Sequence, residues 1–440
     1  MNLKFGTDGI RGPVQSEITP EVCLRIGHAA GIVLKEEGLN TVMIGKDTRV
    51  SGYMLEAALE AGFIAAGINV KLLGPIPTPG VAYLTKTSRK QFGIVISASH
   101  NNFLDNGIKI FDEKGVKISR DLELKIEKLL KGKLKLVDTS SLGKAEAFHE
   151  STARYIEFCK STVPADITFN NLRIVVDCAN GACYKVSPAV FKELGAEVIE
   201  LGVNPDGFNI NHECGSTYPE YAKEMVLKHR ADFGVTLDGD GDRVILIDKD
   251  GNILDGDDLL YILAFSNPNR TGSWSGVVGT LMSNFGLEKA IKQLGYEFIR
   301  ADVGDKYVTQ MLSKKGWMLG GESSGHIICR DLVSTGDGTI AALKVISSLL
   351  MLEKNPKDVL SNYKKFPQIN INIPVKNKDI INDSELKSFI KEVESDMTIG
   401  RVLVRPSGTE SIIRVMVEAA EEEVAQKFAD DIANLIKSKS

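Results

Sequence analysis

The sequence predicts an α/β protein with three similar α/β domains in tandem and a smaller C-terminal α+β domain, whose one active site lies at their junction. Three observations predict this class. The 440 residues correspond to about three domains or slightly more, at roughly 150 residues each. Hydrophobic residues make up 43% of the chain, enough to fill several cores. Short Val/Ile/Leu runs alternate with segments of helical periodicity, which is typical of largely parallel sheets.

The alternation of strand and helix repeats along the chain. In the first copy, strands are predicted at 42–45, 70–73 and 92–97, with a helix at 51–67 between the first two strands. In the second copy, strands are predicted at 174–177, 197–201 and 233–237. Between them, one helix is predicted to begin at Ser187-Pro188 and another at Pro219. A third copy covers 276–319. Three α/β units in tandem follow from this pattern.

The last 75 residues have a different order of elements. Strands are predicted at 370–374, 401–404 and 412–418, and helices at 384–394 and from Glu421. Linkers are expected near 144–150, 250–257 and 363–367. The predicted domains are therefore residues 1–150, 151–252, 253–364 and 365–440.

Charge and cysteine usage exclude several classes of protein. Lys and Arg number 53 against 58 Asp and Glu, a net charge of −5, so neither nucleic acid nor an anionic membrane surface is an expected partner. A local Arg cluster can still bind a small anionic substrate. The six cysteines show no CxxC pair, which fits a reducing cytoplasm. Residues 341–352, the longest nearly apolar stretch, are too short to span a bilayer.

Four polar loops follow predicted strands, near residues 99, 240, 324 and 408. Ligands in open α/β sheets bind outside the carboxyl ends of strands. In the first loop, residues 97–109, a serine just past a buried strand is a candidate nucleophile, with His100 or Lys109 near enough in sequence to take its proton. A polar turn that caps the strand is the alternative.

The second loop, Asp238-Gly-Asp-Gly-Asp-Arg243, is the most specific local signal. Carboxylates at every second position of an extended segment point to one side. Such close like charges repel unless a cation lies among them. An all-oxygen site suits Mg²⁺ ahead of Mn²⁺ or Ca²⁺. A solvated acidic turn is the alternative.

Two further loops suggest substrate contacts. Glu322, Ser324 and His326 alternate in a Gly-rich segment and could face a polyol together, although a turn with a buried histidine would look the same. The segment 405–414 combines glycine, hydroxyl and guanidinium groups as a phosphate cradle would, with a surface turn of ion-paired arginines as the alternative. Arg11 lies in a turn before the first domain.

Together, these loops indicate phosphoryl transfer on a sugar phosphate. The sequence resembles the α-D-phosphohexomutase superfamily over nearly the whole chain. Five ordered motifs carry the resemblance: FGTDGIRG (5–12), ISASHN (96–101), LDGDGDRV (237–244), GGESSGH (320–326), and RPSGTE (405–410) with IRVMVE (413–418).

The resemblance implies a role for each motif. Ser99 would carry the phosphoryl group, and an oxygen of that group would join Asp238, Asp240 and Asp242 around Mg²⁺. Lys109 would transfer protons, and Glu322, Ser324 and His326 would contact the sugar. The non-reacting phosphate would be held by Arg405, Ser407, Gly408, Thr409 and Arg414. Because phosphoserine and three carboxylates exceed the charge of one Mg²⁺, Arg243, Lys109 and Arg11 should add positive charge.

The resemblance, closest in the forms GTDGIRG, LDGDGDRV and IRVMVE, further implies an amino-sugar substrate, although no residue of the sequence can be singled out as the one that reads the 2-amino group. Glucosamine 6-phosphate and glucosamine 1-phosphate would be exchanged through a 1,6-bisphosphate, with glucosamine or glucose 1,6-bisphosphate as activator, for UDP-N-acetylglucosamine and cell-wall synthesis. A mobile fourth domain would close over the site and exclude water. The alternatives are a phosphoglucomutase or phosphomannomutase on the same scaffold and a metal-dependent sugar-phosphate phosphatase. A homodimer stays open, and so does the assignment of the acid and base.

Overall fold

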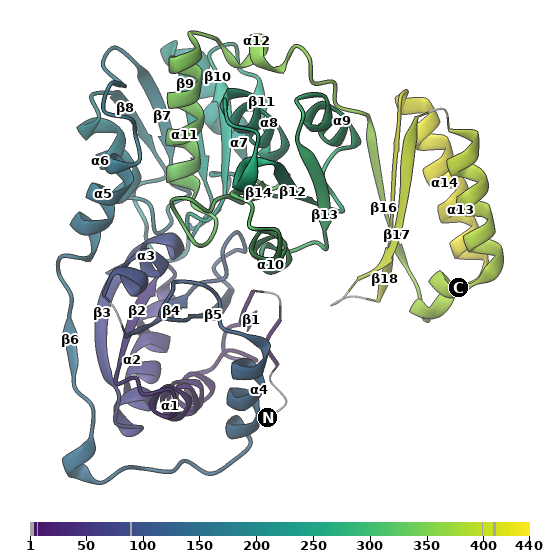
Figure 1. Ribbon diagram of the computed structural model, residues 1–440. Helices are drawn as coiled ribbons and strands as arrows, with labels where there is room; N and C mark the ends of the chain where they lie inside the picture. Colours follow the sequence, from purple (N-terminus) through teal and green to yellow (C-terminus); the bar gives the residue numbers. More distant parts are fainter. Residues whose placement is uncertain (1–3, 7, 89, 398, 408–410) are drawn as a thin grey trace.

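The chain forms four sheets that follow one another along the sequence (Figure 1). The computed structural model describes residues 1–440 except 1–3, 7, 89, 398 and 408–410. Three α/β units make up the body of the molecule, and a small sheet with two helices stands beside it (Figure 1). The predicted fold class is confirmed.

The first sheet has six strands in the order β1-β5-β4-β2-β3-β6. Its strands are β1 (Ile10–Pro13), β2 (Thr41–Lys46), β3 (Asn69–Pro75), β4 (Phe92–Ile96), β5 (Asp105–Phe111) and β6 (Ala145–Ala147). Its helices are α1 (Pro20–Glu36), α2 (Val50–Ala65), α3 (Thr78–Ser88) and α4 (Arg120–Leu130). Thr19 caps α1 by accepting a hydrogen bond from Val22 N, and proline occupies the first helical turn, so the sequence itself starts this helix.

Two elements of this unit differ from the sequence prediction. Helix α3 lies in a stretch between two predicted strands for which no helix was expected. Strand β6 lies within a segment expected to be a linker and pairs in parallel with β3 at the edge of the sheet.

The second sheet has the order β11-β10-β9-β7-β8. Its strands are β7 (Arg173–Asp177), β8 (Glu197–Leu201), β9 (Phe233–Leu237), β10 (Val244–Asp248) and β11 (Ile253–Leu254). Its helices are α5 (Ser151–Ser161), α6 (Val186–Glu193) and α7 (Pro219–His229). The predicted strands and helix starts of this unit are confirmed to within a residue.

The third sheet has the order β13-β12-β14-β15. Its strands are β12 (Gly276–Thr280), β13 (Glu297–Ala301), β14 (Leu319–Gly321) and β15 (Ile327–Cys329). Its helices are α8 (Gly256–Ser266), α9 (Phe285–Gln293), α10 (Asp305–Lys315), α11 (Gly338–Leu352) and α12 (Pro356–Leu360). Helix α11 contains the apolar stretch noted in the sequence, and it is buried along most of its length.

The fourth sheet is small and antiparallel, in the order β16-β18-β17. It consists of β16 (Gln368–Pro374), β17 (Gly400–Pro406) and β18 (Ile412–Ala419), with helices α13 (Ser384–Asp396) and α14 (Glu422–Ser438). Its core is separate from those of the other sheets. The predicted elements of this unit are confirmed.

Each sheet contains an antiparallel hairpin, although the sequence pattern predicted largely parallel strands. In the first three sheets a parallel strand is followed by one that returns beside it: β4 by β5, β9 by β10 and β14 by β15. In the fourth sheet β17 and β18 form the hairpin. The hairpin connections are residues 97–104, 238–243, 322–326 and 407–411. They lie within the four predicted functional loops, whose remaining residues belong to the flanking strands β5, β14, β17 and β18. We call the first two connections the Ser99 loop and the carboxylate loop.

The six cysteines are all described, and all are buried and free of disulfide bonds. They lie at positions 23, 159, 178, 183, 214 and 329, so the fourth unit has none. Among the described residues, helices long and apolar enough to cross a membrane are absent.

Candidate active site

The Ser99 loop brings its serine into contact with the carboxylate loop. Ser99 is 1% exposed, and its backbone φ of +51° is unusual for a residue with a side chain. Its Oγ donates a hydrogen bond to Asp238 Oδ2 at 2.5 Å. His100 Nδ1 lies 3.4 Å from the same Oγ. The predicted nucleophile and the first predicted metal ligand are therefore neighbours, although 139 positions separate them.

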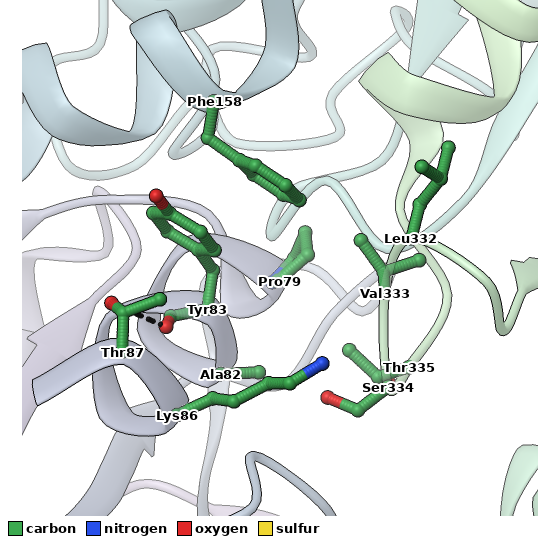
Figure 2. Close-up of a pocket in the computed structure, with 10 residues that line it drawn as sticks. All are labelled: Pro79, Ala82, Tyr83, Lys86, Thr87, Phe158, Leu332, Val333, Ser334 and Thr335. Carbon is green, nitrogen blue, oxygen red and sulfur yellow. Dashed lines mark hydrogen bonds between the residues drawn. The ribbon is translucent and has the colours of Figure 1, made fainter. Parts of the chain in front are cut away.

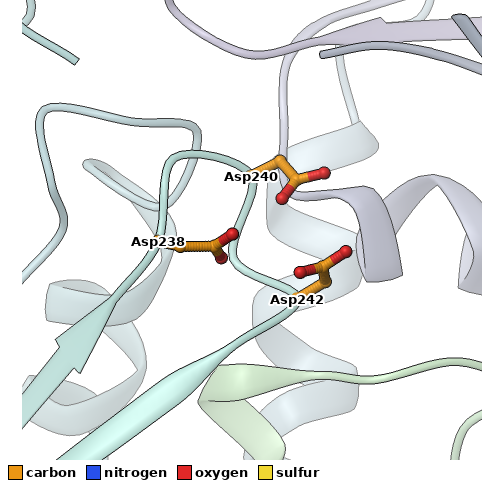
Figure 3. A group of neighbouring side chains, drawn as sticks. All are labelled: Asp238, Asp240 and Asp242. Carbon is orange, nitrogen blue, oxygen red and sulfur yellow. The ribbon is translucent and has the colours of Figure 1, made fainter. Parts of the chain in front are cut away.

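The three aspartates of the carboxylate loop converge as their spacing predicts (Figure 3). All are buried, and one ligand oxygen from each lies within 4.8 Å of the others. Burial, together with the charges of Asp242 and Asp240, raises the pKa of Asp238 well above its ordinary value. Oδ1 of Asp240 and Oδ1 of Asp242 are buried without a hydrogen-bond partner. Unpaired buried carboxylate oxygens in an all-oxygen set fit a hard cation such as Mg²⁺.

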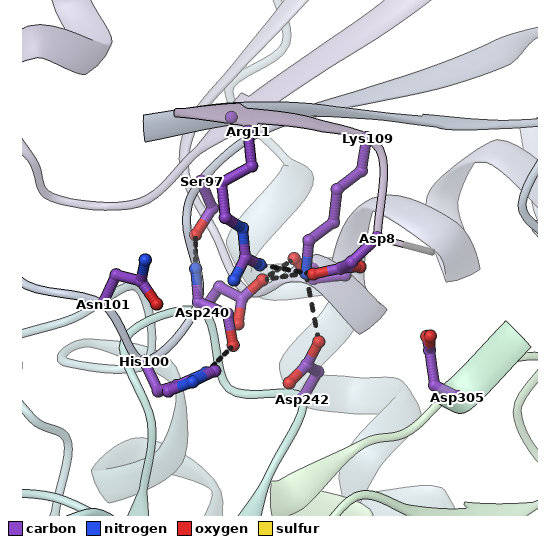
Figure 4. Close-up of polar contacts among 12 residues, drawn as sticks. Asp8, Arg11, Ser97, His100, Asn101, Lys109, Asp240, Asp242 and Asp305 are labelled. Atoms are coloured by element: carbon purple, nitrogen blue, oxygen red, sulfur yellow. Dashed lines mark hydrogen bonds and ion pairs between the residues drawn. The ribbon is translucent and has the colours of Figure 1, made fainter. Parts of the chain in front are cut away.

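Lys109 contacts the same carboxylates (Figure 4). Its Nζ contacts Asp240 Oδ2 at 2.8 Å, Asp242 Oδ2 at 3.1 Å and Asp8 Oδ2 at 3.2 Å. Burial alone would lower the pKa of Lys109, but the three carboxylates outweigh burial and raise the pKa well above its ordinary value. Lys109 is therefore held in its charged form.

Sequence analysis did not identify a group of charges at the edge of the site (Figure 4). Asp8 pairs closely with the predicted Arg11. Lys117 Nζ lies 2.5 Å from Asp8 Oδ1 and 2.5 Å from Asp305 Oδ2, and so joins the first unit to the third. Asp8 belongs to the same sequence motif as Arg11, and this shared motif could have identified Asp8 as a site residue. Lys117 and Asp305 stand in no motif.

One cleft of about 500 Å³ collects side chains from the N-terminal segment, the hairpin loops and the loop after β13. It is lined by these predicted site residues: Arg11, His100, Asp242, Arg243, Glu322, Ser324, His326, Arg405 and Arg414. Ser99, Lys109, Asp238 and Asp240 are buried next to lining residues of this cleft, since Ser99 Oγ lies 3.4 Å from His100 Nδ1 and Lys109 Nζ lies 3.1 Å from Asp242 Oδ2. A cleft of this size is suited to a small polar ligand such as a hexose phosphate.

The 322–326 loop is ordered by contacts at both ends. Glu322 Oε1 accepts a hydrogen bond from Gly304 N at 3.0 Å. His326 Nε2 accepts one from Gly336 N at 3.1 Å, so the ring proton belongs on Nδ1, which lies 3.6 Å from Asp242 Oδ1. Both side chains are nevertheless among those that line the cleft. His326 is thus buried and held, as the structural alternative expected, while it also borders the predicted metal ligands.

The fourth hairpin places two arginines opposite each other. Arg405 on β17 and Arg414 on β18 are direct cross-strand partners, and both line the cleft. Burial, and then the charge of Arg414, lower the pKa of Arg405. Like charges directly opposite on a sheet repel, and a bound anion would relieve this repulsion. Ser407 is buried beside them, whereas the predicted Gly408 and Thr409 lie outside the described residues.

A second, mainly apolar pocket lies between α3, α5 and the loop before α11 (Figure 2). Pro79, Tyr83, Phe158 and Val333 are among its lining residues. None of the predicted site residues lines it. The predicted site residues therefore lie away from this apolar pocket.

Family models match all four units of the chain. Models described as phosphoglucomutase/phosphomannomutase α/β/α domains I, II and III match residues 2–136, 153–251 and 255–366. The model of the C-terminal domain of the same family matches residues 371–435.

Curated relatives and solved structures agree with the family models. "Phosphoglucosamine mutase" of Legionella pneumophila (strain Lens) is 52% identical over 98% of this chain and 97% of its own. The protein of the same name from Thioalkalivibrio sulfidiphilus is 50% identical over 99% and 98%. A phosphoglucomutase/phosphomannomutase family protein of Burkholderia thailandensis has the same fold, with a TM-score of 0.82 at 24% identity over 98% of this chain and 97% of its own.

The fold is also that of the N-acetylphosphoglucosamine mutase of Aspergillus fumigatus, solved in complex with GlcNAc-6P and magnesium. Its TM-score is 0.73 at 19% identity, covering 100% of this chain and 96% of its own. The chain belongs to the phosphoglucomutase/phosphomannomutase family and, within it, to the phosphoglucosamine mutases.

Proposed function

We propose that this enzyme interconverts glucosamine 6-phosphate and glucosamine 1-phosphate through a phosphoserine at Ser99 and a 1,6-bisphosphate intermediate. The observation that carries the proposal is the 2.5 Å contact between Ser99 Oγ and Asp238, next to a cleft that is lined by His100, Asp242, Arg405 and Arg414. One end of the cleft thus has a nucleophile with carboxylates, and the other has a pair of guanidinium groups.

The three carboxylates beside the cleft fit Mg²⁺. Asp238, Asp240 and Asp242 would hold it, together with an oxygen of the phosphorylated serine. When bound, it would supply positive charge that stabilises the transferring phosphoryl group. Lys109, already fixed on two of the carboxylates, adds a second positive charge at the same place, and Arg243 and Arg11 reach the cleft from two sides.

Each half-reaction moves one phosphoryl group. The phosphorus–oxygen bond to Ser99 breaks while a bond forms to a hydroxyl of the hexosamine phosphate. In this step the hydroxyl loses its proton and Ser99 Oγ gains one, and both proton transfers are reversed when Ser99 takes the phosphoryl group back from the bisphosphate. Of the three side chains considered for these proton transfers, His100 has its Nδ1 within hydrogen-bond distance of Ser99 Oγ, at 3.4 Å. Burial lowers the pKa of His100 to about 4, so its ring is neutral and can accept a proton. Lys109 is held charged by its carboxylates, and His326 faces Asp242. We therefore assign the proton to His100.

The bisphosphate must turn round between the two half-reactions. Arg405, Arg414, Ser407, Gly408 and Thr409 would hold whichever phosphate is not reacting, while Glu322, Ser324 and His326 would contact the hydroxyl groups common to both orientations. Glucosamine or glucose 1,6-bisphosphate would phosphorylate Ser99 at the start. Closure of the fourth unit over the cleft would exclude the water that hydrolyses phosphoserine.

Kinetics with three substrates test the proposal. Glucosamine 6-phosphate, glucose 6-phosphate and mannose 6-phosphate are compared by kcat/KM, each with its 1,6-bisphosphate and Mg²⁺. We expect the glucosamine compound to be favoured. A glucose or mannose phosphate that matched it would assign the enzyme to phosphoglucomutases or phosphomannomutases. Inorganic phosphate as the main product would indicate a phosphatase.

The wider context follows from the same proposal. The product would supply amino sugar for UDP-N-acetylglucosamine and cell-wall synthesis, and the six free thiols fit a cytoplasmic location. The domain boundaries at 150, 252 and 364 stay predictions, as does the absence of nucleic-acid and membrane partners. A homodimer stays open.

A further inference from the structure

The turn at residues 47–50, between β2 and α2, contains a fully buried arginine that no motif includes. Arg49 is 0% exposed and is among the largest completely buried side chains. Its Nε donates to Asp47 Oδ2 at 2.8 Å, and both groups are fully buried. A buried ion pair is costly unless hydrogen bonds satisfy its remaining groups. The other N–H groups of the Arg49 guanidinium therefore need hydrogen-bond acceptors inside the protein.

Those hydrogens are directed to backbone carbonyls of the Ser99 loop and of Asp105, the first residue of β5. The Nη2 of Arg49 donates to Ser99 O at 2.9 Å and to Asn101 O at 2.8 Å. Its Nη1 donates to Asn102 O and, at 3.2 Å, to Asp105 O. One side chain thus collects four carbonyls around the candidate nucleophile, which needs the planar fork that arginine has and lysine lacks.

The partner of Arg49 fixes the other side of the loop. Asp47 Oδ2 accepts a hydrogen bond from Ser97 Oγ at 2.6 Å, and Ser97 Oγ accepts one from Ser99 N at 2.9 Å. Ser99 is therefore held through its own N–H and its own C=O. This double attachment explains how a non-glycine residue keeps a φ of +51°, a conformation that persists only where its surroundings enforce it.

The same turn also attaches the second unit, which provides the carboxylate loop. Thr48 Oγ1 donates to Asn180 O at 2.5 Å, and Val50 N donates to Gly207 O at 2.9 Å. From the second unit, Asn211 Nδ2 donates to Ser99 O at 2.9 Å and to Asn101 O at 2.9 Å. The turn is thus bonded both to the nucleophile's loop and to the unit that holds Asp238.

We infer that Arg49 is a positioning residue for phosphoryl transfer, which sets Ser99 Oγ against the carboxylate loop in both half-reactions. It does not touch the substrate, because it is fully buried behind the loop. Its removal should therefore reduce kcat and leave the binding of the hexose phosphate, which we assign to Arg405 and Arg414, nearly unchanged. The inference rests on the proposed function.

The test compares Arg49→Lys with Lys46→Met. Lys46 lies three residues earlier, is also buried and pairs with Glu56, but it makes none of the contacts to the Ser99 loop. For each variant we would measure the melting temperature, kcat, KM and the rate at which the 1,6-bisphosphate phosphorylates Ser99, followed by intact mass. We expect Arg49→Lys to lower kcat and the phosphorylation rate about 10²-fold, the scale of a displacement near 1 Å, with KM changed less than about threefold.

The control variant Lys46→Met separates a loss of loop positioning from a general loss of stability. Lys46→Met should lower the melting temperature and leave kcat within about twofold. A folded Arg49→Lys with wild-type kcat would overturn the inference, and so would an equal loss of kcat in Lys46→Met. Wild-type protein without mutase turnover would instead contradict the proposed function.

A milder variant decides the case in which Arg49→Lys does not fold. Asn211→Ala removes only the donor from the second unit to Ser99 O and Asn101 O. We expect kcat to fall about tenfold at an unchanged melting temperature, the effect of one lost orienting contact. An unchanged kcat would overturn the inference.

Discussion

The two ends of the cleft are built in opposite ways. At the chemical end, Ser99, Lys109, Asp238 and Asp240 are at most 1% exposed and bond to one another across two units. At the phosphate end, Arg405 and Arg414 are half-buried on a small sheet with its own core. The proposed reaction needs a nucleophile that is fixed in place, which the rigid chemical end would provide. It also needs room for the bisphosphate to turn round, which a phosphate end on a separate unit would allow.

The attachment of the fourth sheet supports this contrast. Arg401 donates to Leu281 O at 2.8 Å and to Ser283 O at 2.8 Å, and Glu418 accepts from Phe285 N at 3.2 Å. The side chain of Asn284 bonds to both N and O of Phe366 in the connecting segment. These contacts converge on residues 281–285, so the sheet could pivot on one short segment while the chemical end stays in place.

The strongest test of the rigid end is Ser99→Ala. Because we assign the phosphoryl group to Ser99 Oγ, we expect removal of this oxygen to lower kcat at least about 10⁴-fold with an unchanged melting temperature. Intact mass and peptide mapping should find one phosphoryl group on Ser99 of the wild type and none in the variant. Phosphate on Ser97, or wild-type turnover in the variant, would contradict the assignment.

Asp240→Asn tests whether the rigid end depends on a cation. The change removes one ligand charge and a partner of Lys109, and we expect roughly a 10³-fold loss of kcat, equivalent to several kcal/mol of charge stabilisation. Asp248→Asn is the matched control, since Asp248 is buried in the same hairpin but binds only turn amides and the Asn252 side chain. Full wild-type activity after exhaustive chelation would exclude the metal site.

Arg414→Ala tests the other end of the cleft. A charged hydrogen bond to phosphate contributes about 1.5–3 kcal/mol, so KM should rise about 10- to 100-fold, and bisphosphate should be released before it has turned round. Lys427→Ala removes the same charge from an exposed position of α14 in the same unit and should change neither quantity. An unchanged KM without bisphosphate release would separate the fourth sheet from substrate binding.

Asp257→Asn tests the junction between the two ends, with the smallest effect on turnover. Asp257 Oδ2 accepts from Asn284 N at 2.7 Å, and burial, followed by the charge of Asp255, raises its pKa from 3.8 to about 7. Because the folded state binds this proton more tightly, the stability that Asp257 contributes is full below about pH 4 and is lost as pH rises to about 7.

Thermal or urea unfolding from pH 4 to 8 measures this effect. The variant should gain stability relative to the wild type as pH rises, on the order of 3 kcal/mol at pH 7. Asp250→Asn, at an exposed turn, is the control. A difference between Asp257→Asn and wild type that did not change with pH would contradict the assignment.

The sequence predicted what depends on local pattern. The carboxylate loop was recognisable because alternating carboxylates in an extended segment must face one another, and the hairpin loops because they follow buried strands. Helix α3 was missed because its residues, including Pro79 and Gly80, have low helix propensity and form a helix through burial.

The unrecognised residues of the site are those whose partners are distant in sequence. Thr78, at the start of α3, donates to Asp240 Oδ2 at 2.5 Å across 162 positions, and Arg49 reaches the Ser99 loop across 50. Lys117 and Asp305 meet across 188. No local period indicates such contacts, because only the packing of the separate units brings the groups together.

The buried thiols have a practical consequence for measuring motion. Burial raises the pKa of Cys23 and of Cys329 to about 12, so an alkylating reagent reacts with them only when the surrounding structure opens. The cysteines occupy the first three units and none lies after residue 329. Alkylation rates, resolved by peptide, would thus report transient opening of each of these units separately, and a single cysteine introduced into β16–β18 would give the fourth unit its own signal.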